Sequence, residues 1–478
     1  MDQHEEKVTR PVNPRRRKRS QMQIFKESYL PVLIAGAALL LIFVFIIGSV
    51  ARGIQTRKAA TAASIEASIA AQEELDRLNM QADALLEDAA ILAARYDYAG
   101  AVAKLDSFSG DMAQFEKLVT ARQEYVQAQD QMVAWNDPAQ VRSLSFQLLI
   151  ADTQRAFTNA AYGTAYNRNF VTTGEFSEML EQLYANGYVL VSLDDFLTTE
   201  TTDTGAVIYK AKTLYLPAGK KPLLLTQTNV NYNTYMIDGD GDKFPDKDGA
   251  GFASRLIIGE NGKLTCQMVD SSGSTVTGAF DLVPILDAFV ESHPDFSYRG
   301  AKAILAVTGY DGLFGYRTYA KARDYFGVST YEQDVNDVKA VIKALRDSGY
   351  DIACYTYENV AYGKRSATQI QADLSGWIAE VMPILGNVDI FAFAQVSDLT
   401  DKATAYTGDA YNTLYNTGFR YFLGFCDDGK PWATVTDDYV RIGRILVTGS
   451  NMAYHADWFS GMFDASSLLD PTRGEVPN

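Results

Sequence analysis

The chain has 478 residues, of which 21% are charged and 47% hydrophobic, and a formal net charge of −16. This length allows two or three domains and a large buried core. The acidic balance argues against nucleic acid as a partner, because phosphates are repelled by a negative surface. Three scattered cysteines, Cys266, Cys354 and Cys426, are too few for a disulfide framework or a zinc cluster. They allow either one bridge or three buried free thiols.

A basic N-terminal segment precedes the most apolar part of the chain. Residues 1–28 contain eight Lys or Arg and four Asp or Glu, a net +4 that leaves −20 for the rest. Residues 30–51 then carry no charge over 22 positions, enough to cross a hydrocarbon layer of about 30 Å. A signal peptide would be shorter and followed by a cleavage site, so we expect an uncleaved membrane anchor at 29–51. The positive-inside rule places the tail 1–28 in the cytoplasm and the C-terminal part outside the cell, as a single-pass protein.

Residues 52–136 have the composition of a helical stalk, rich in Ala, Glu, Gln and Leu. Apolar side chains recur at helical spacing, first at 65, 69, 75 and 78 and then at 85, 86, 89 and 92. The Tyr96-Asp97-Tyr98 corner and the turn at 109–111 divide the segment into three helices, and Pro138 follows its end. Residues 85–105 resemble one tetratricopeptide-like hairpin, too little for a repeat array. A spacer is therefore expected, with a coiled coil or partner docking as the alternative.

From residue 137 to 478, strand-like and helix-like segments alternate, which favours a parallel sheet covered by helices. We expect strands at 144–150, 189–193, 223–226, 303–307, 351–354, 389–393, 421–424 and 445–448. We expect helices at 173–186, 282–292, 332–348, 368–382 and 410–417. Gly187, Gly349 and Gly418 each stand between a helix and a strand, as capping glycines do. Seven or eight such units favour an α/β fold, a distorted (β/α)7-8 barrel, over an open sheet.

The stretch 221–232, KPLLLTQTNVNY, has the pattern of a buried strand whose polar end begins at Thr226. In a parallel barrel, that carboxyl end is where functional sites form. The stretch resembles the first motif of the polysaccharide deacetylase (NodB-homology) family, an apolar strand followed by Thr/Ser-Phe-Asp-Asp. Gln227 stands at the aromatic position, and Thr228 and Asn229 stand at the two aspartates. The resemblance implies that the family's general base and one metal ligand belong at 228 and 229.

The resemblance, closest to a membrane-anchored Gram-positive branch, covers most of residues 144–477. The phrases that carry it include LLIADTQRAF, TTGEFSEMLEQLYANGYVLVSLDDF, GFASRLII and LRDSGYDIACYTYEN. The family's second motif, His-Ser/Thr-x-x-His, matches residues 355–359, where Tyr355 and Asn359 replace the histidines and Thr356 is kept. The third motif matches 391–396, which lack its Arg, Pro and Gly, and Gln147 stands where relatives often carry a His.

These changes remove the ligands of a catalytic metal. A hydrolytic divalent cation needs about three anionic or imidazole ligands to lower the pKa of its water toward 7. The four positions that match the family's base and ligands, Thr228, Asn229, Tyr355 and Asn359, offer neither group near neutral pH. The resemblance therefore implies a catalytically inactive barrel with no catalytic cofactor.

Histidine is too scarce to rebuild the site elsewhere. The chain has three, of which His4 falls in the predicted cytoplasmic tail and His293 in a Ser-His-Pro turn. His455 could lie near the barrel opening, where a structural role is expected. A pseudoenzyme is thus the first hypothesis. An active metal-dependent carbohydrate or peptidoglycan N-deacetylase with non-standard ligands is the second, and a scaffold acting through the stalk is the third.

Other polar and aromatic side chains should gather at the same opening, and the ligand-binding candidates are Asn231, Tyr232, Tyr357 and Gln395. Amides, hydroxyls and aromatic faces suit a neutral sugar or peptide, because they offer hydrogen bonds and stacking without charge. This predicts binding of a cell-wall glycan or of a membrane-protein partner. The alternative is a polar surface left behind by lost catalysis.

Carboxylates recur at alternate positions in the loop 238–249, DGDGDKFPDKDG, and they are Asp238, Asp240, Asp242, Asp246 and Asp248. The pattern resembles EF-hand or thrombospondin-type calcium loops. It departs from an EF-hand at Lys243, which occupies the glycine position, and at Gly249, which stands in place of the last Glu. Ca²⁺ binding and a merely solvated acidic loop are both compatible with this sequence.

Overall fold

The computed structural model describes residues 38–39 and 54–478. The chain divides into two compact units, Met1–Gln81 and Ala82–Asn478. The predicted cytoplasmic tail and the predicted anchor lie outside the described residues, apart from positions 38 and 39. Within the described ranges, no helix combines the length and the apolar character that crossing a membrane requires.

The predicted stalk is helical, as its periodicity indicates. Its helices are α2 (Ile54–Ala93), α3 (Tyr98–Asp106) and α4 (Glu116–Asp130). The predicted corner is a left-handed turn at Tyr96, with φ of 62°, and the Asp97 carboxylate caps α3 by accepting from the Gly100 amide. The division between the two units falls inside α2, so that residues 82–136 belong to the same unit as the barrel.

Polar contacts join the helical corner to the barrel within this unit. The Tyr96 hydroxyl donates to Asp295 Oδ2 over 3.2 Å, and Arg299 Nε lies 3.1 Å from Asp97 Oδ1. The Lys220 ammonium lies 3.3 Å from Asp295 Oδ2 and 5.8 Å from the centre of the Tyr96 ring. This part of the predicted stalk is therefore docked on the barrel.

Seven parallel strands close into a barrel in the order β11-β12-β13-β14-β16-β2-β7, and β7 pairs with β11 to complete the ring. The strands are β2 (Arg142–Phe146), β7 (Lys221–Thr228), β11 (Ala303–Val307), β12 (Asp351–Cys354), β13 (Ile390–Ala392), β14 (Tyr421–Phe425) and β16 (Val440–Leu446). β3 (Tyr188–Leu190) pairs in parallel with the first half of β7, and β15 (Ala433–Val435) pairs antiparallel with β16. The predicted barrel is confirmed, with seven strands in the ring.

Alternate residues of each strand belong to two separate buried clusters, because successive side chains of a strand point to opposite faces. One cluster contains Leu225, Leu305 and Phe391 together with residues of the outer helices, and it lies between barrel and helices. The other contains Leu224, Ile304, Ala353, Ala392 and Ile442 and fills the interior. Ser143, Ser145, Thr226 and Ala306 have the same parity as this second set and are buried. The interior is thus lined by small and polar side chains toward the carboxyl ends of the strands.

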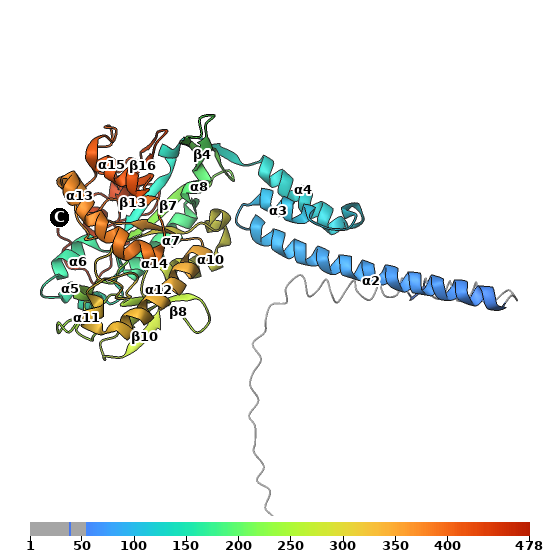
Figure 1. The fold of residues 1–478 in the computed structure, drawn as a ribbon, viewed down its shortest axis with the longest axis horizontal. Helices are drawn as coiled ribbons and strands as arrows, with labels where there is room; N and C mark the ends of the chain where they lie inside the picture. Colours follow the sequence, from blue (N-terminus) through green and yellow to red (C-terminus); the bar gives the residue numbers. More distant parts are fainter. Residues whose placement is uncertain (1–37, 40–53) are drawn as a thin grey trace, which may run out of the picture. The chain divides into compact units, whose positions relative to one another are not determined.

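Helices surround the barrel (Figure 1). They are α5 (Thr153–Thr158), α6 (Gly163–Asn169), α7 (Thr173–Ala185), α8 (Leu193–Phe196), α9 (Thr234–Ile237), α10 (Leu282–Ser292), α11 (Ala322–Phe326), α12 (Val328–Asp347), α13 (Ala367–Gly376), α14 (Met382–Leu385), α15 (Gly408–Thr417) and α16 (Gly449–Tyr454). A capping box between Thr172 and Glu175 begins α7. Gly187, Gly349 and Gly418 have φ of 79°, 93° and 114°, which confirms the glycine caps.

Some boundaries differ from the predicted ones. The strand predicted at 445–448 runs from Val440 to Leu446 in the structure. The prediction missed its first residues, because Arg441, Gly443 and Arg444 interrupt the apolar pattern of the sequence there. The strand predicted at 144–150 leaves the barrel after Phe146, and Ile150 instead bridges Thr172 and Phe252. The helix predicted at 368–382 ends its regular part at Gly376 and continues as a π-helical turn, Trp377–Val381.

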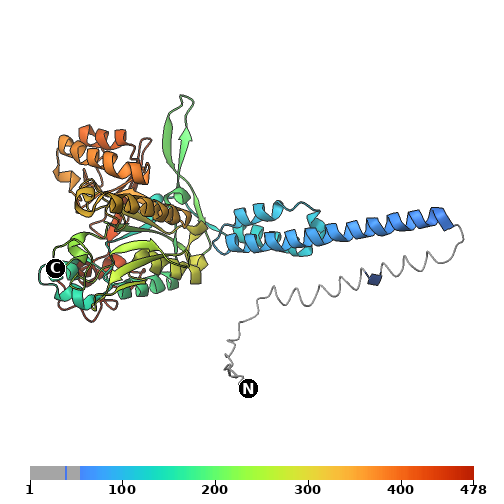
Figure 2. The same cartoon turned by 60° about the horizontal axis from the view of Figure 1, so that its bottom comes forward.

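Three small sheets decorate the barrel. They consist of β1 (Val133–Trp135) with β6 (Leu214–Leu216), β4 (Leu197–Thr201) with β5 (Val207–Ala211), and β8 (Arg255–Ile258), β9 (Leu264–Val269) and β10 (Thr275–Gly278). Figure 2 shows the β4–β5 hairpin standing out from the barrel. Cys266, Cys354 and Cys426 are free and buried, which agrees with the second of the two predicted states.

Candidate functional site

The positions matched to the three family motifs lie where the barrel strands β7, β12 and β13 end, and β11 stands between β7 and β12 in the ring. We call the loops that follow these strands, residues 228–232, 308–316, 355–359 and 394–397, the mouth. Because parallel strands present their carboxyl ends at one edge of the barrel, the four loops share one face of the molecule. The sequence prediction that these positions meet is consistent with this topology.

The first-motif positions are buried at the end of β7. Thr228 is 4% exposed, and its hydroxyl donates to the Phe146 carbonyl over 3.1 Å. Asn229 adopts a left-handed conformation with φ of 58° and is 6% exposed. Its Oδ1 has no hydrogen-bond partner among the described residues. Gln227 points to the outer side of the barrel, where its Nε2 donates to Asp281 Oδ1 over 2.7 Å and to the Gln147 carbonyl over 3.3 Å.

Asn231 and Tyr232 are fully buried and bonded within the fold. The Asn231 amide donates to the Thr308 carbonyl over 2.8 Å and also to the Gly312 carbonyl, and its Oδ1 accepts from the Thr308 amide over 3.0 Å. The Tyr232 hydroxyl donates to Asp281 Oδ2 over 2.7 Å, and its backbone has φ of 52°. These two predicted ligand-binding side chains fix the loop after β7 and do not face the open surface.

The second-motif positions lie after β12. Tyr355 is half-buried and packs against the interior cluster. The fully buried Thr356 has φ of 62°, and its hydroxyl oxygen accepts from the Val360 amide over 3.0 Å. The half-buried Tyr357 lies between two glycines: a Cβ at Gly309 would lie 2.0 Å from its Cε2, and one at Gly376 would lie 2.6 Å from its Cδ1. Tyr355 is therefore the second-motif aromatic residue that faces the barrel interior.

A side chain of the third-motif loop contacts the second-motif loop directly. Gln395 Nε2 donates to the Asn359 carbonyl over 2.5 Å, and the two residues have φ of 52° and 54°. The structure thus brings together two of the predicted site residues from different strands.

Backbone strain is concentrated at the mouth. Of the eleven described non-glycine residues with positive φ, eight belong to its four loops, and they are Asn229, Tyr232, Asp311, Phe314, Thr356, Asn359, Gln395 and Val396. Such conformations cost about 1–3 kcal/mol each and persist where the surrounding structure imposes them, most often at functional sites. The structure around the mouth therefore imposes these strained backbone conformations on its four loops.

The residues at the matched positions do not fit a catalytic metal. The Thr228 hydroxyl already donates a hydrogen bond to a backbone carbonyl. Asn229, Tyr355 and Asn359 supply no carboxylate or imidazole. In the described part of the chain, the His, Cys, Asp and Glu side chains that converge closely enough for a cation are Asp238, Asp240 and Asp246. They belong to the loop after α9 and not to the mouth.

That acidic loop folds around its own carboxylates. Ligand oxygens of Asp238, Asp240 and Asp246 lie within 4.8 Å of one another. Asp238 Oδ2 accepts from the Lys243 amide over 2.7 Å, and Asp246 Oδ2 accepts from the Gly239 amide over 2.9 Å. Partial burial acts to raise the pKa of Asp246, but several backbone amides outweigh it and hold the pKa below its ordinary value.

The other two carboxylates of the loop point elsewhere. Asp242 Oδ1 accepts from the Phe244 amide over 2.8 Å, and Asp248 pairs with Lys247 over 2.7 Å. Three of the five residues expected to form a calcium site are therefore gathered by the fold.

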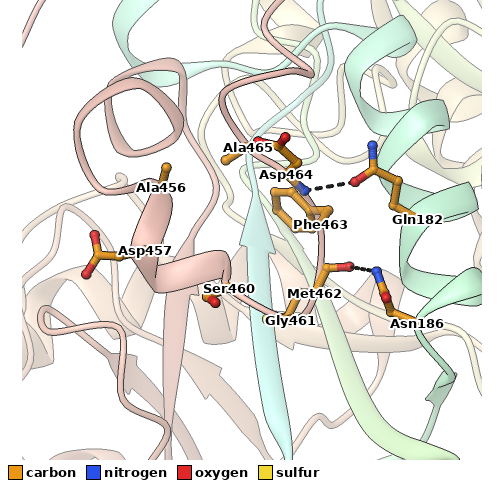
Figure 3. A pocket seen from close by; sticks show the side chains of 10 residues that line it. All are labelled: Gln182, Asn186, Ala456, Asp457, Ser460, Gly461, Met462, Phe463, Asp464 and Ala465. Carbon is orange, nitrogen blue, oxygen red and sulfur yellow. Dashed lines mark hydrogen bonds between the residues drawn. The ribbon is translucent and has the colours of Figure 1, made fainter.

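None of the residues that line an open pocket of about 500 Å³ belongs to the mouth. Figure 3 shows this pocket from close by. It lies beside the end of α7, which leads to the amino end of β3, and the facing wall is the segment 456–465. Gln182 Oε1 accepts from the Asp464 amide over 2.8 Å, and Asn186 Nδ2 donates to the Met462 carbonyl over 3.0 Å. These bonds attach the C-terminal segment to α7.

The two described histidines take part in ring contacts. His455 stacks on Trp458 with ring centres 4.3 Å apart, and His293 stacks on Phe289 at 4.5 Å. Neither belongs to the mouth, and the stacking of His455 on Trp458 agrees with the structural role expected for His455.

Sequence reasoning missed buried charges next to the mouth, among them those of Asp281 and Arg444. Asp281 is fully buried behind β7; burial raises its pKa, while Tyr232, the amides of Leu149 and Leu282, and Gln227 lower it by hydrogen bonding. Arg444 of β16 is fully buried with the parity of the barrel interior. The available signal was VRIGRILV, in which two arginines interrupt an apolar strand.

No family model and no curated protein sequence matches the chain. Solved structures similar to it include the Streptococcus pyogenes deacetylase PplD in complex with acetate, at 10% identity and a TM-score of 0.33, covering 69% of this chain and 98% of that one. A polysaccharide deacetylase from Bacillus cereus has 11% identity and a TM-score of 0.33, and a Bacillus anthracis protein described as a polysaccharide deacetylase has 10% and 0.32; each covers 69% of both chains. The fold assignment rests on the strand pairing itself, and this closed ring of seven parallel strands with surrounding helices is consistent with a NodB-like domain.

Proposed function

We propose that the protein is a membrane-anchored, extracellular, catalytically inactive relative of the polysaccharide deacetylases whose barrel mouth binds a cell-wall glycan. The resemblance of the sequence motifs supports the family, and the uncharged run at 30–51 after a basic tail supports the anchor. The absence of carboxylates and imidazoles from the four matched positions supports inactivity.

One observation carries the binding role: the strained backbone of the mouth. Eight left-handed non-glycine residues in four adjacent loops are costly to keep, and a surface released from selection would not need them. The loops present the exposed amide side chain of Gln395 and the half-buried ring of Tyr355. These groups hydrogen-bond and stack on sugars without requiring charge.

Retention of the full-length protein, in detergent, on insoluble chitin and on peptidoglycan tests this proposal. Tyr355→Ala should reduce retention about tenfold or more, because an aromatic contact contributes on the order of 1–3 kcal/mol when a buried face is lost. The matched control is Thr199→Ala on the exposed β4–β5 hairpin, which should bind as the unmodified protein does. No retention on either polymer, or equal retention of both variants, rejects the glycan role.

Docking of a partner protein through the stalk is tested in the same preparation. Because residues 82–136 fold with the barrel, the segment to alter is the exposed surface of α2 before Ala82, for example Ile69 and Leu75. Co-purification of a membrane protein that is lost with Ile69→Lys, while glycan retention is unchanged, would favour the scaffold hypothesis.

A further inference from the structure

Arg444 places a guanidinium inside the barrel beneath the mouth. The residue is 0% exposed. Its Nε donates to the Gly424 carbonyl over 3.2 Å, Nη2 to the Phe393 carbonyl over 2.9 Å, and Nη1 to Ser145 Oγ over 3.4 Å. A guanidinium has five N–H groups, so these three bonds leave donors to spare.

The Arg444 guanidinium forms no ion pair with any residue that the structure describes. No described carboxylate lies within ion-pair distance of Arg444, and Asp398, which influences it electrostatically, is paired with Arg441 over 3.0 Å. Burial lowers the pKa of Arg444 to about 10, while Tyr355 and Asp398 act in the opposite direction. An unpaired buried charge costs folding free energy, and an anion beside the guanidinium would recover part of that cost.

Unpartnered hydroxyls share the same interior. Ser143 Oγ and Thr226 Oγ1 are buried and have no hydrogen-bond partner among the described residues. Thr226 is the register partner of Ser145, which accepts from Arg444, so both face inward on adjacent strands. A water molecule could satisfy a hydroxyl, but it could not neutralise the guanidinium. The combination of spare donors and an unbalanced charge favours a polar, anionic guest.

We propose that Arg444 binds the carboxylate of an acidic sugar that enters the barrel through the mouth. The proposal rests on the glycan-binding function and adds the charge of the ligand. A carboxylate can accept two parallel N–H bonds from one guanidinium. Because Arg444 is 0% exposed, the carboxylate reaches it only when the loops of the mouth move apart beside Tyr355, the half-buried ring that packs on the interior cluster. Because the chain beyond residue 28 carries −20, recognition would depend on this local cation and not on the overall field.

Calorimetric titration of the full chain with D-glucuronate and with D-glucose, which differ at one carbon, tests the proposal. We expect glucuronate to bind about tenfold more tightly or better, since a hydrogen bond between two charged groups is stronger than one to a neutral hydroxyl. Arg444→Gln should abolish this preference, and Arg444→Lys should keep part of it. The control Arg323→Gln removes the same charge from an exposed helix and should change nothing.

Equal binding of the two sugars by the unmodified protein, or a preference that survives in folded Arg444→Gln, overturns the assignment. If that variant does not fold, a crystal of the unmodified protein soaked in glucuronate decides: a carboxylate on the Arg444 guanidinium supports the proposal, and a carboxylate elsewhere rejects it. Chitin binding without any preference for glucuronate would reject the proposed role of Arg444 but leave the glycan-binding function standing. Binding of neither class of glycan would reject the proposed function as well.

Discussion

Arg473 and Glu175 form a buried bidentate ion pair although 298 positions separate them in the sequence. Arg473 Nε lies 2.5 Å from Glu175 Oε1, and Nη2 lies 2.6 Å from Oε2, with both side chains at most 2% exposed. Glu175 also completes the capping box of α7, and Arg473 donates to the Phe170 carbonyl over 2.7 Å. The pair thereby attaches the C-terminal segment to the start of α7 and to the residue that follows α6.

Arg473→Met should destabilise the protein by about 3–5 kcal/mol, because it leaves the Glu175 carboxylate buried without its cation. Guanidinium chloride unfolding measures the loss. Lys343→Met is the matched control, since its pair with Asp347 is exposed at 75% and 61% and should contribute less than about 1 kcal/mol. Similar small effects for both variants would show that the buried pair contributes little to the folded state.

The carboxyl group of Asp351 should make the stability of the folded protein depend on pH. Burial, followed by the nearby carboxylates of Asp194, Asp389 and Asp195, raises the pKa of Asp351 from 3.8 to about 6. A raised folded-state pKa favours folding below about pH 4, and this contribution is lost as the pH rises through about 6. Asp351→Asn should therefore be more stable than the unmodified protein at pH 7–8, by roughly 1–2 kcal/mol after allowance for solvent screening.

Thermal melts of Asp351→Asn between pH 4 and pH 8 measure this difference, which should shrink toward zero at the acidic end. Asp203→Asn, in the exposed β4–β5 turn, controls for the change in net charge. A stability gain that is the same at every pH would contradict the assigned cause.

Gly309 and Tyr357 lie so close together that substitutions of the two residues should have coupled effects on stability. Gly309→Ala would place a methyl group 2.0 Å from the ring, so the ring or the loop must move, at a cost of about 1–3 kcal/mol. Tyr357→Ala should remove most of that cost when the two are combined. Gly474→Ala, where an added Cβ meets nothing within 4 Å, should be neutral. A double-mutant cycle by thermal unfolding checks the coupling, and additive effects would show that the two residues do not restrict each other.

Calcium should raise the melting temperature if the loop 238–249 binds it. A ligand that binds only the folded state adds about 2.7 kcal/mol to the free energy of unfolding when its free concentration is one hundred times its Kd. Asp240→Ala removes one of the three converging carboxylates and should abolish the shift. Asp248→Ala removes a carboxylate that pairs with Lys247 instead and should keep it. An unchanged melt of the unmodified protein in millimolar calcium would identify a solvated acidic loop.

Much of the barrel follows from local sequence. The strands at 303–307 and 351–354 and the helix at 282–292 have their predicted boundaries, because each is an uninterrupted pattern closed by turn or capping residues. The start of β16 could not be predicted in this way. Its arginines are buried by partners far along the chain, such as the Phe393 carbonyl for Arg444.

The mouth was predictable in position but not in detail. Thr228, Asn229, Tyr355 and Asn359 lie at strand ends as the motifs imply. The burial of Asn231 and Tyr232 depends on Thr308 and on Asp281, which tertiary folding brings beside β7. No local pattern announces such contacts, because they form only when the barrel closes.

Metal-dependent hydrolysis is the measurement that tests the central claim most directly. The full-length protein would be incubated with Zn²⁺ or Co²⁺ and acetylated chitooligosaccharide or peptidoglycan, and released acetate would be measured with and without chelator. Because Thr228, Asn229, Tyr355 and Asn359 supply no carboxylate or imidazole, we predict no acetate release above the metal-only control. Turnover that depends on protein and metal and disappears with the chelator would contradict the assignment of an inactive barrel.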